Sequence, residues 1–190
     1  MKKISVGFAL CGSFCTFGKV IPEIEKLVSD GYDIVPIMSH TAYTTDTRFG
    51  KSSDFIRQIS DICGKDIIKT IAESEPIGPK KLLDALIIAP CTGNTAAKLA
   101  CGITDTSVTM AAKAHLRNAR PLIIAISTND ALAANARNIG TLSVMKNIFF
   151  VPYRQDDSSG KPNSLVADMG KIGETLSSAL KGQQIQPILA

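Results

Sequence analysis

Small hydroxyl and amide side chains follow an apolar segment near the middle of the chain, where they could bind a phosphate or a carbonyl group. The apolar run 85–89 ends at Pro90, and Cys91-Thr92-Gly93-Asn94-Thr95 then leads into an Ala-rich segment. Ligands of open parallel sheets lie beyond the carboxyl ends of the strands, so these side chains stand where a ligand is expected. Thr92 or Asn94 could cap the following helix, whose free N–H groups would hold an anion or a carbonyl. Capping without a ligand is the alternative.

Three further turns after apolar segments carry side chains of the same kind. They are 11–18 with Gly12, Ser13, Phe14 and Thr16, then 39–45 with Ser39 and Thr41, and finally 126–130 with Ser127, Asn129 and Asp130. Glycine lets the backbone approach a phosphate and the hydroxyls can donate to it, although the spacing is neither the dinucleotide G-x-G-x-x-G nor a Walker loop. The alternatives are a plain glycine turn, a loop that bonds its own backbone, and a helix start at Asn129 or Asp130.

The elements that must position these turns alternate between apolar strands and amphipathic helices. Strands are predicted over 4–10, 33–38, 66–70, 85–89, 122–126 and 148–151, and helices over 19–30, 53–63, 94–100, 106–118, 131–146 and 167–180. This order predicts an α/β fold, a three-layer, doubly wound, Rossmann-like parallel sheet of about six strands. The whole chain, 1–190, is expected to form one domain, with a polar loop over 153–163 and a C-terminal helix.

Composition excludes several classes of function. The net charge of +4 is dispersed and aromatic residues make up 5%, which argues against nucleic-acid binding. No apolar run is long enough to span a membrane. Five cysteines without paired spacing fit buried thiols in a reducing cytoplasm, and two separated histidines predict no metal site.

Several segments, taken together, resemble the flavoprotein family, the homo-oligomeric flavin-containing cysteine decarboxylases. They are DALIIAP at 84–90, CTGNT at 91–95, KLA at 98–100 and GITD at 102–105, with the turns at 7–14 and 39–42 resembling the other flavin-contacting loops of the family. The resemblance covers residues 4 to 150 and implies bound FMN, or phosphate in its place, and a homotrimer or a dodecamer. It implies that the phosphate and ribityl chain lie at Gly12, Ser13, Phe14, Ser39 and Thr41, and that the flavin ring lies at Pro90, Cys91, Thr92, Asn94 and Thr95, with Ser127 and Asn129 completing the site.

The departures from the family pattern bear on catalysis. The catalytic histidine of the decarboxylases would fall near Pro76, and no histidine lies between residues 41 and 114. The Pro-Ala-Met-Asn clamp of the family is replaced by Ile126-Ser127-Thr128-Asn129, which keeps only the asparagine. Decarboxylation of a thiol substrate is therefore not expected, and no catalytic residue is assigned.

Over its whole length the chain resembles family members that act as one subunit of a two-subunit oxidoreductase in spore-forming bacteria. This implies a separate dehydrogenase partner that carries NADP, a cyclic dicarboxylate oxidised to the aromatic diacid, and a place in the mother-cell cytoplasm. Lys98 is the expected anchor for the dicarboxylate, with Arg48 and Lys51 added from charge alone. The alternative is a non-catalytic scaffold that stabilises the dehydrogenase.

Overall fold

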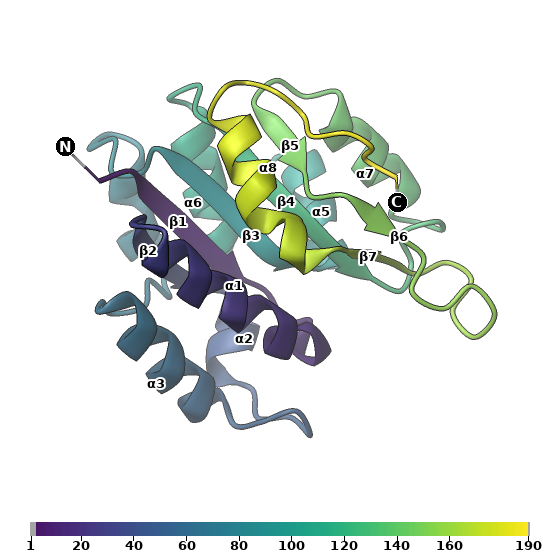
Figure 1. Ribbon diagram of the computed structural model, residues 1–190, viewed down its shortest axis with the longest axis horizontal. Coiled ribbons are helices and arrows are strands. Elements are labelled where there is room, and N and C mark those ends of the chain that lie inside the picture. Colours follow the sequence, from purple (N-terminus) through teal and green to yellow (C-terminus); the bar gives the residue numbers. More distant parts are fainter. Residues whose placement is uncertain (1–2, 190) are drawn as a thin grey trace.

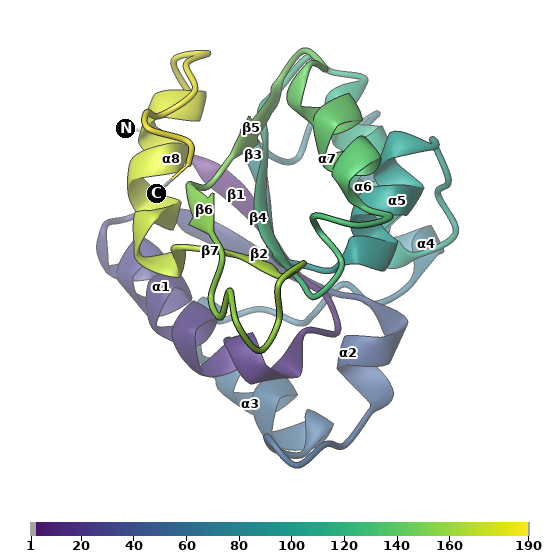
Figure 2. The ribbon, with the colours of Figure 1, turned by 90° about the vertical axis from the view of Figure 1, so that its right-hand side faces the viewer.

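The structure, a computed structural model, describes residues 3–189, which form a seven-stranded sheet between two layers of helices (Figures 1 and 2). Five strands run parallel in the order β2-β1-β3-β4-β5. The first half of β4 pairs with β5, and its last two residues pair with the antiparallel strand β7, which pairs in turn with β6. The strands are β1 (Ser5–Leu10), β2 (Asp33–Met38), β3 (Ala85–Cys91), β4 (Leu122–Thr128), β5 (Ile148–Phe150), β6 (Tyr153–Arg154) and β7 (Leu165–Ala167).

Helices cover both faces of the sheet. Figure 2 shows α1, α3 and α8 on one side and α5, α6 and α7 on the other. The α-helices are α1 (Phe17–Ser29), α2 (His40–Thr44), α3 (Ser52–Cys63), α4 (Ile71–Ser74), α5 (Gly93–Ala100), α6 (Ser107–Leu116), α7 (Ala136–Ser143) and α8 (Ile172–Ala179). Short 3-10 helices span Phe14–Thr16, Glu75–Ile77 and Met169–Lys171. Within residues 3–189, every helix is too short or too polar to cross a lipid bilayer.

The central strands are buried on both faces, as their unbroken apolar runs predict. Every residue of β3 is buried, and so is every residue of β4 except Thr128. Alternate side chains of these strands enter two separate apolar clusters, one under α1 and α8 and the other under α6 and α7. The predicted three-layer, doubly wound, Rossmann-like fold is confirmed. Four of the predicted helices agree with α1, α3, α5 and α6 to within two residues at each end.

The predicted strand over 66–70 is wrong. Only Ile68 pairs with the sheet, through a single parallel bridge to Ile37. The chain then turns into α4, because Thr70 caps that helix reciprocally with Glu73 in a capping box. The start of a helix therefore ends the extended segment after one paired residue.

The predicted helix over 131–146 is also wrong in extent. Residues 129–135 form turns, and only Ala136–Ser143 is helical. The reason is that Asn135 donates two hydrogen bonds back to Asp130, from its side-chain amide to the Asp130 carboxylate and from its backbone N–H to the Asp130 carbonyl. The predicted helix over 167–180 is likewise shorter. It begins as the Met169–Lys171 3-10 turn, which Asp168 caps, while Ala167 belongs to β7.

Candidate functional site

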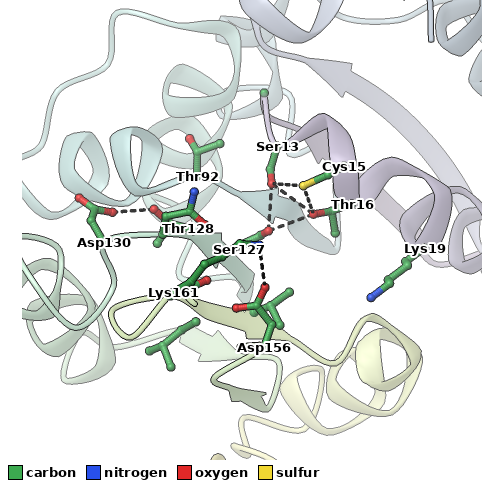
Figure 3. Close-up of a pocket in the computed structure, with 15 residues that line it drawn as sticks. Ser13, Cys15, Thr16, Lys19, Thr92, Ser127, Thr128, Asp130, Asp156 and Lys161 are labelled. Atoms are coloured by element: carbon green, nitrogen blue, oxygen red, sulfur yellow. Dashed lines mark hydrogen bonds and ion pairs between the residues drawn. The ribbon is translucent and has the colours of Figure 1, made fainter. Parts of the chain in front are cut away.

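A cavity of about 500 Å³ lies at the carboxyl ends of β1, β3 and β4 (Figure 3). Its walls come from the β1–α1 turn, from Thr92 after β3, from the end of β4 and from the segment between β6 and β7. The lining residues are Gly12, Ser13, Cys15, Thr16, Lys19, Thr92, Ser127, Thr128, Asn129, Asp130, Asp156, Lys161, Ser164, Leu165 and Val166. The cavity thus lies at the edge of the sheet where ligands of parallel folds bind.

Three hydroxyl groups meet on one wall of this cavity. The Ser127 Oγ lies 2.9 Å from the Ser13 Oγ and 3.0 Å from the Thr16 Oγ1, and the last two atoms are 3.2 Å apart. Ser127 and Thr16 are buried, and the β1–α1 turn brings Ser13 and Thr16 to the end of β4, more than a hundred residues along the chain. Because each hydroxyl can turn its proton outward, this hydroxyl cluster can donate to an anion in the cavity.

A fixed carboxylate stands on the opposite wall. Asp130 accepts a hydrogen bond from the Thr128 hydroxyl at 2.6 Å and from the Asn135 amide at 2.7 Å, and the buried Asn138 amide donates to Asn135 at 2.8 Å. The Thr128 bond is the main reason that the pKa of the Asp130 carboxyl lies below its usual range. The alternative interpretation of this turn, a helix cap at Asn129 or Asp130, is wrong, because α7 begins only at Ala136 and its N-cap residue is Asn135.

Helix α5 approaches this carboxylate through Gly93. A Cβ atom added at Gly93 would lie 2.5 Å from the Asn135 Nδ2 and 2.7 Å from both the Asp130 Oδ1 and the Thr128 Oγ1. Only glycine leaves room for this contact. Thr92 caps α5, as predicted, by accepting a hydrogen bond from the Thr95 N–H at 3.3 Å.

The polar segment between β6 and β7 forms the outer wall. The Asp156 carboxylate lies 3.6 Å from the Lys161 Nζ, and hydrogen bonding to Ser164 is the main reason that the pKa of Asp156 lies below its usual range. Lys19, near the start of α1, is the second cation that lines the cavity. The sequence predicted a polar loop over 153–163 but did not assign Asp156 or Lys161 to the site. The first two residues of that predicted loop, Tyr153–Arg154, form β6 instead.

Two cysteines near the site are buried and have raised pKa values. Cys11 and Cys91 are both fully buried, and burial raises the pKa of the Cys11 thiol to about 11 and that of Cys91 well above its usual value. Cys11 also accepts a hydrogen bond from the Thr95 hydroxyl at 3.2 Å. Cys15, in contrast, is exposed on the cavity wall and contacts the Ser13 and Thr16 hydroxyls.

The structure brings some of the expected site residues together and leaves others apart. Gly12, Ser13, Thr92, Ser127 and Asn129 line the cavity. The other expected residues do not line it, because their side chains are engaged elsewhere or face away. The Ser39 side chain caps α2, the Phe14 ring packs against Phe17, and the Thr95 hydroxyl bonds Cys11. Pro90 and Cys91 are the last two residues of the buried strand β3. Asn94 and Thr41 are exposed on helices.

The three expected carboxylate anchors lie outside this cavity. The Lys98 Nζ binds both carboxylate oxygens of Asp105, at 2.8 and 2.9 Å. Lys51 precedes α3, and the Arg48 guanidinium stacks over the exposed Phe49 ring. Charge alone therefore does not locate the cationic wall. The lysines that do line the cavity are Lys19 and Lys161.

Comparison with known proteins identifies the family to which the chain belongs. The Flavoprotein family model matches residues 1–178, so the chain belongs to the flavoprotein family. The B subunit of dipicolinate synthase from Bacillus subtilis (strain 168) is 47% identical over 189 residues, covering 100% of this chain and 94% of that protein.

Solved structures give the same result. The crystal structure of the B subunit of dipicolinate synthase from Bacillus halodurans C superposes with a TM-score of 0.91 at 48% identity, covering 100% of this chain and 98% of the other. The structure of Burkholderia xenovorans DmrB in complex with FMN, described as a cubic protein cage for redox transfer, has a TM-score of 0.70 at 18% identity and covers 94% of this chain and 96% of that chain. The second likeness is one of fold alone.

Proposed function

We propose that this chain is the FMN-carrying B subunit of a dipicolinate synthase. In this proposal it acts with a separate NADP-dependent dehydrogenase, the A subunit, to convert a dihydro or hydroxy-tetrahydro precursor to pyridine-2,6-dicarboxylate during sporulation, in the cytoplasm of the mother cell. The observation that carries the proposal is the hydroxyl cluster of Ser13, Thr16 and Ser127 in a cavity of about 500 Å³, in a chain so similar to the named B subunits.

The residues of the cavity fit the groups that FMN presents. The hydroxyl cluster and the backbone at Gly12 suit a phosphate, because several donors converge there and Lys19 lines the same cavity. Thr92 and Asn129 offer polar groups along the same wall for a ribityl chain or a ring carbonyl. FMN would supply the redox chemistry when bound, and the protein would supply binding, orientation and charge.

Asp130 would contribute a fixed negative charge to the same cavity. Its carboxylate has two hydrogen-bond donors and a lowered pKa, so it stays ionised at neutral pH and can accept a hydrogen bond from an N–H or O–H group of a bound molecule. Two consecutive hydrogen bonds, from Asn138 to Asn135 and from Asn135 to Asp130, hold the carboxylate in place, and both asparagines are buried.

A second function is favoured by one specific observation. Residues 41–114 contain no histidine where the family decarboxylases carry their catalytic one, which is what a subunit that has kept the fold and lost its chemistry would show. Such a chain would be a scaffold for the dehydrogenase. It would still bind that partner and would leave all turnover to it.

The experiment that tests the proposal is a titration of the purified chain with FMN, followed by quenching of flavin fluorescence, and repeated with riboflavin. Hydrogen bonds to a charged group contribute about 1.5–3 kcal/mol, so the double variant Ser13→Ala/Ser127→Ala should bind FMN about 10- to 100-fold more weakly. Riboflavin, which lacks the phosphate, should lose far less. Ser177→Ala is the matched control, because Ser177 is exposed on α8 and bonds only the Gly173 carbonyl.

Two results would contradict the proposal. The first is a parent protein that binds no FMN, which would leave the scaffold function. The second is equal FMN affinity in the double variant and the parent, which would remove the hydroxyl cluster from the phosphate site.

A further inference from the structure

The ion pair between Lys161 and Asp156 lies in the cavity and contributes little to the stability of the fold. The Lys161 Nζ and the Asp156 Oδ2 are 3.6 Å apart, and the two side chains are 52% and 34% exposed. Half-exposed pairs of this length contribute little to stability. Both residues nevertheless line the cavity that also holds the hydroxyl cluster.

The backbone around this pair is held by bonds that do not involve the lysine side chain. The Lys161 N–H donates to the Asp157 carbonyl at 2.8 Å, the Gly160 N–H donates to the Asp157 Oδ1 at 2.8 Å, and the Gln155 amide donates to the Pro162 carbonyl at 2.8 Å. The Leu132 N–H also donates to the Asn163 carbonyl at 3.0 Å, which joins the segment to the turn after β4. The main chain at Lys161 is therefore placed over the cavity, while its ammonium group remains free to change partner.

Asp156 would not become an unpaired buried charge if Lys161 turned toward a ligand. Its side chain is 34% exposed, so water can solvate the carboxylate in place of the lysine. Hydrogen bonding to Ser164, more than the interaction with Lys161, lowers the pKa of Asp156. The pair can thus open without the cost of a buried, unpaired charge.

The charges of the cavity decide what Lys161 would bind. Its carboxylates are Asp130 and Asp156, and its cations are Lys19 and Lys161. Asp130 already has two donors, Thr128 and Asn135, and Lys19 lies in α1, close in sequence to Ser13 and Thr16 of the hydroxyl cluster. Lys161 comes from the separate segment between β6 and β7, so it is the cation available to a second anionic group.

We propose that Lys161 is the specificity-determining residue of this cavity, exchanging Asp156 for a carboxylate of a small cyclic dicarboxylate. The inference rests on the proposed function for the identity of that ligand. Asp156 competes with the ligand for the Lys161 ammonium group, because it pairs with that group when no ligand carboxylate is bound. The segment between β6 and β7 then selects for an acid over a neutral ring of the same shape.

The test is calorimetric titration of the full-length chain with pyridine-2,6-dicarboxylate, with and without saturating FMN. Lys161→Gln should weaken binding by about tenfold, the loss expected for one charge-assisted hydrogen bond. Asp156→Asn should tighten it by about threefold, because it removes the competing charge and keeps the size of the side chain. Lys146→Gln, an exposed lysine outside the cavity, is the control and should bind like the parent.

A neutral analogue separates charge from shape. Pyridine-2,6-dicarboxamide should bind more weakly than the diacid and should be insensitive to Lys161→Gln. The FMN affinity of all three variants should stay within about twofold of the parent, because the phosphate lies at the hydroxyl cluster.

The inference and the proposed cofactor fail in different ways. If FMN does not bind but the diacid affinity still follows Lys161 and Asp156 as stated, the cofactor is wrong and the inference holds. If the parent does not bind the diacid, or if Lys161→Gln and Lys146→Gln bind it equally, or if Asp156→Asn binds it more weakly, the inference is overturned. If Lys161→Gln instead weakens FMN, the lysine serves the cofactor phosphate and the inference is again overturned.

Discussion

Replacing Gly93 by alanine probes the contact between α5 and the Asp130 carboxylate. The added Cβ would lie 2.5–2.7 Å from three polar atoms, on Asn135, Asp130 and Thr128. These atoms belong to hydrogen bonds of 2.6 and 2.7 Å, so none of them can withdraw without lengthening a bond. The strain therefore falls on the cavity wall itself.

The size of the effect follows from three contributions. Overpacking costs about 1–3 kcal/mol, and weakening one of the hydrogen bonds costs about 1 kcal/mol. Alanine regains at most about 1 kcal/mol over glycine in a helix. The net loss should be about 2 kcal/mol in the free energy of unfolding.

The assay is urea denaturation followed by far-UV circular dichroism. With a slope of about 2 kcal/mol per molar urea, the midpoint of Gly93→Ala should fall by about 1 M. Gly140→Ala is the matched control, because Gly140 lies in the exposed face of α7 with no atom within 4 Å of the added Cβ. It should raise the midpoint by about 0.3 M. A Gly93→Ala midpoint equal to or above that of the parent would refute this account of the contact.

Three further predictions concern titration, thiol access and helix capping. Burial lowers the pKa of His115 to about 4, against about 6.5 in the unfolded chain, so the folded state loses stability as the pH falls from 6.5 toward 4. The free energy of unfolding of the parent should therefore fall by about 2 kcal/mol between pH 7 and pH 5 in urea titrations. In His115→Gln, which can still donate to the Pro121 carbonyl, this fall should be smaller by about 2 kcal/mol. Iodoacetamide should label the exposed Cys15 and Cys101 of the native chain and should not label the buried Cys11 and Cys91. FMN should protect Cys15, which lines the cavity, but not Cys101. If peptide mass spectrometry shows Cys101 to be equally protected, the cavity is not the binding site. Thr70→Ala removes the capping box of α4 and should cost about 1 kcal/mol of unfolding free energy with no change in FMN affinity, as measured by the same titrations.

The layered fold could be predicted because its central strands are unbroken apolar runs. In β3 and β4 nearly every residue is buried, so the sequence shows no alternation and a parallel sheet is the consistent interpretation. The turns after β1, β2, β3 and β4 were all predicted to contribute to one site. Ser13, Thr92 and Ser127 do line one cavity, whereas Ser39 and Thr41 after β2 do not line it. The rule that ligands bind beyond the carboxyl ends of parallel strands was sufficient to predict that these three residues share a site.

The remainder of the site depends on contacts between distant segments. The predicted helix over 131–146 is too long because its composition is helical, whereas the bond from Asn135 to Asp130 holds the first residues in turns. Asp156 and Lys161 were missed because only the pairing of β7 with the end of β4 brings their segment to the cavity. Lys98 was expected at the site from its place in the family motif, but Asp105 binds it through both oxygens. Ion-pair partners are a property of the folded chain, and no local spacing indicates them.

FMN binding in the cavity at the carboxyl ends of β1, β3 and β4 can be tested by the visible absorption spectrum of the purified chain before and after addition of FMN, together with the mass of any cofactor released on denaturation. We expect flavin bands that persist through gel filtration and a released mass equal to that of FMN. Both should be lost in Ser13→Ala/Ser127→Ala. A colourless protein at every FMN concentration would contradict FMN binding and would leave the chain as a structural partner of the dehydrogenase.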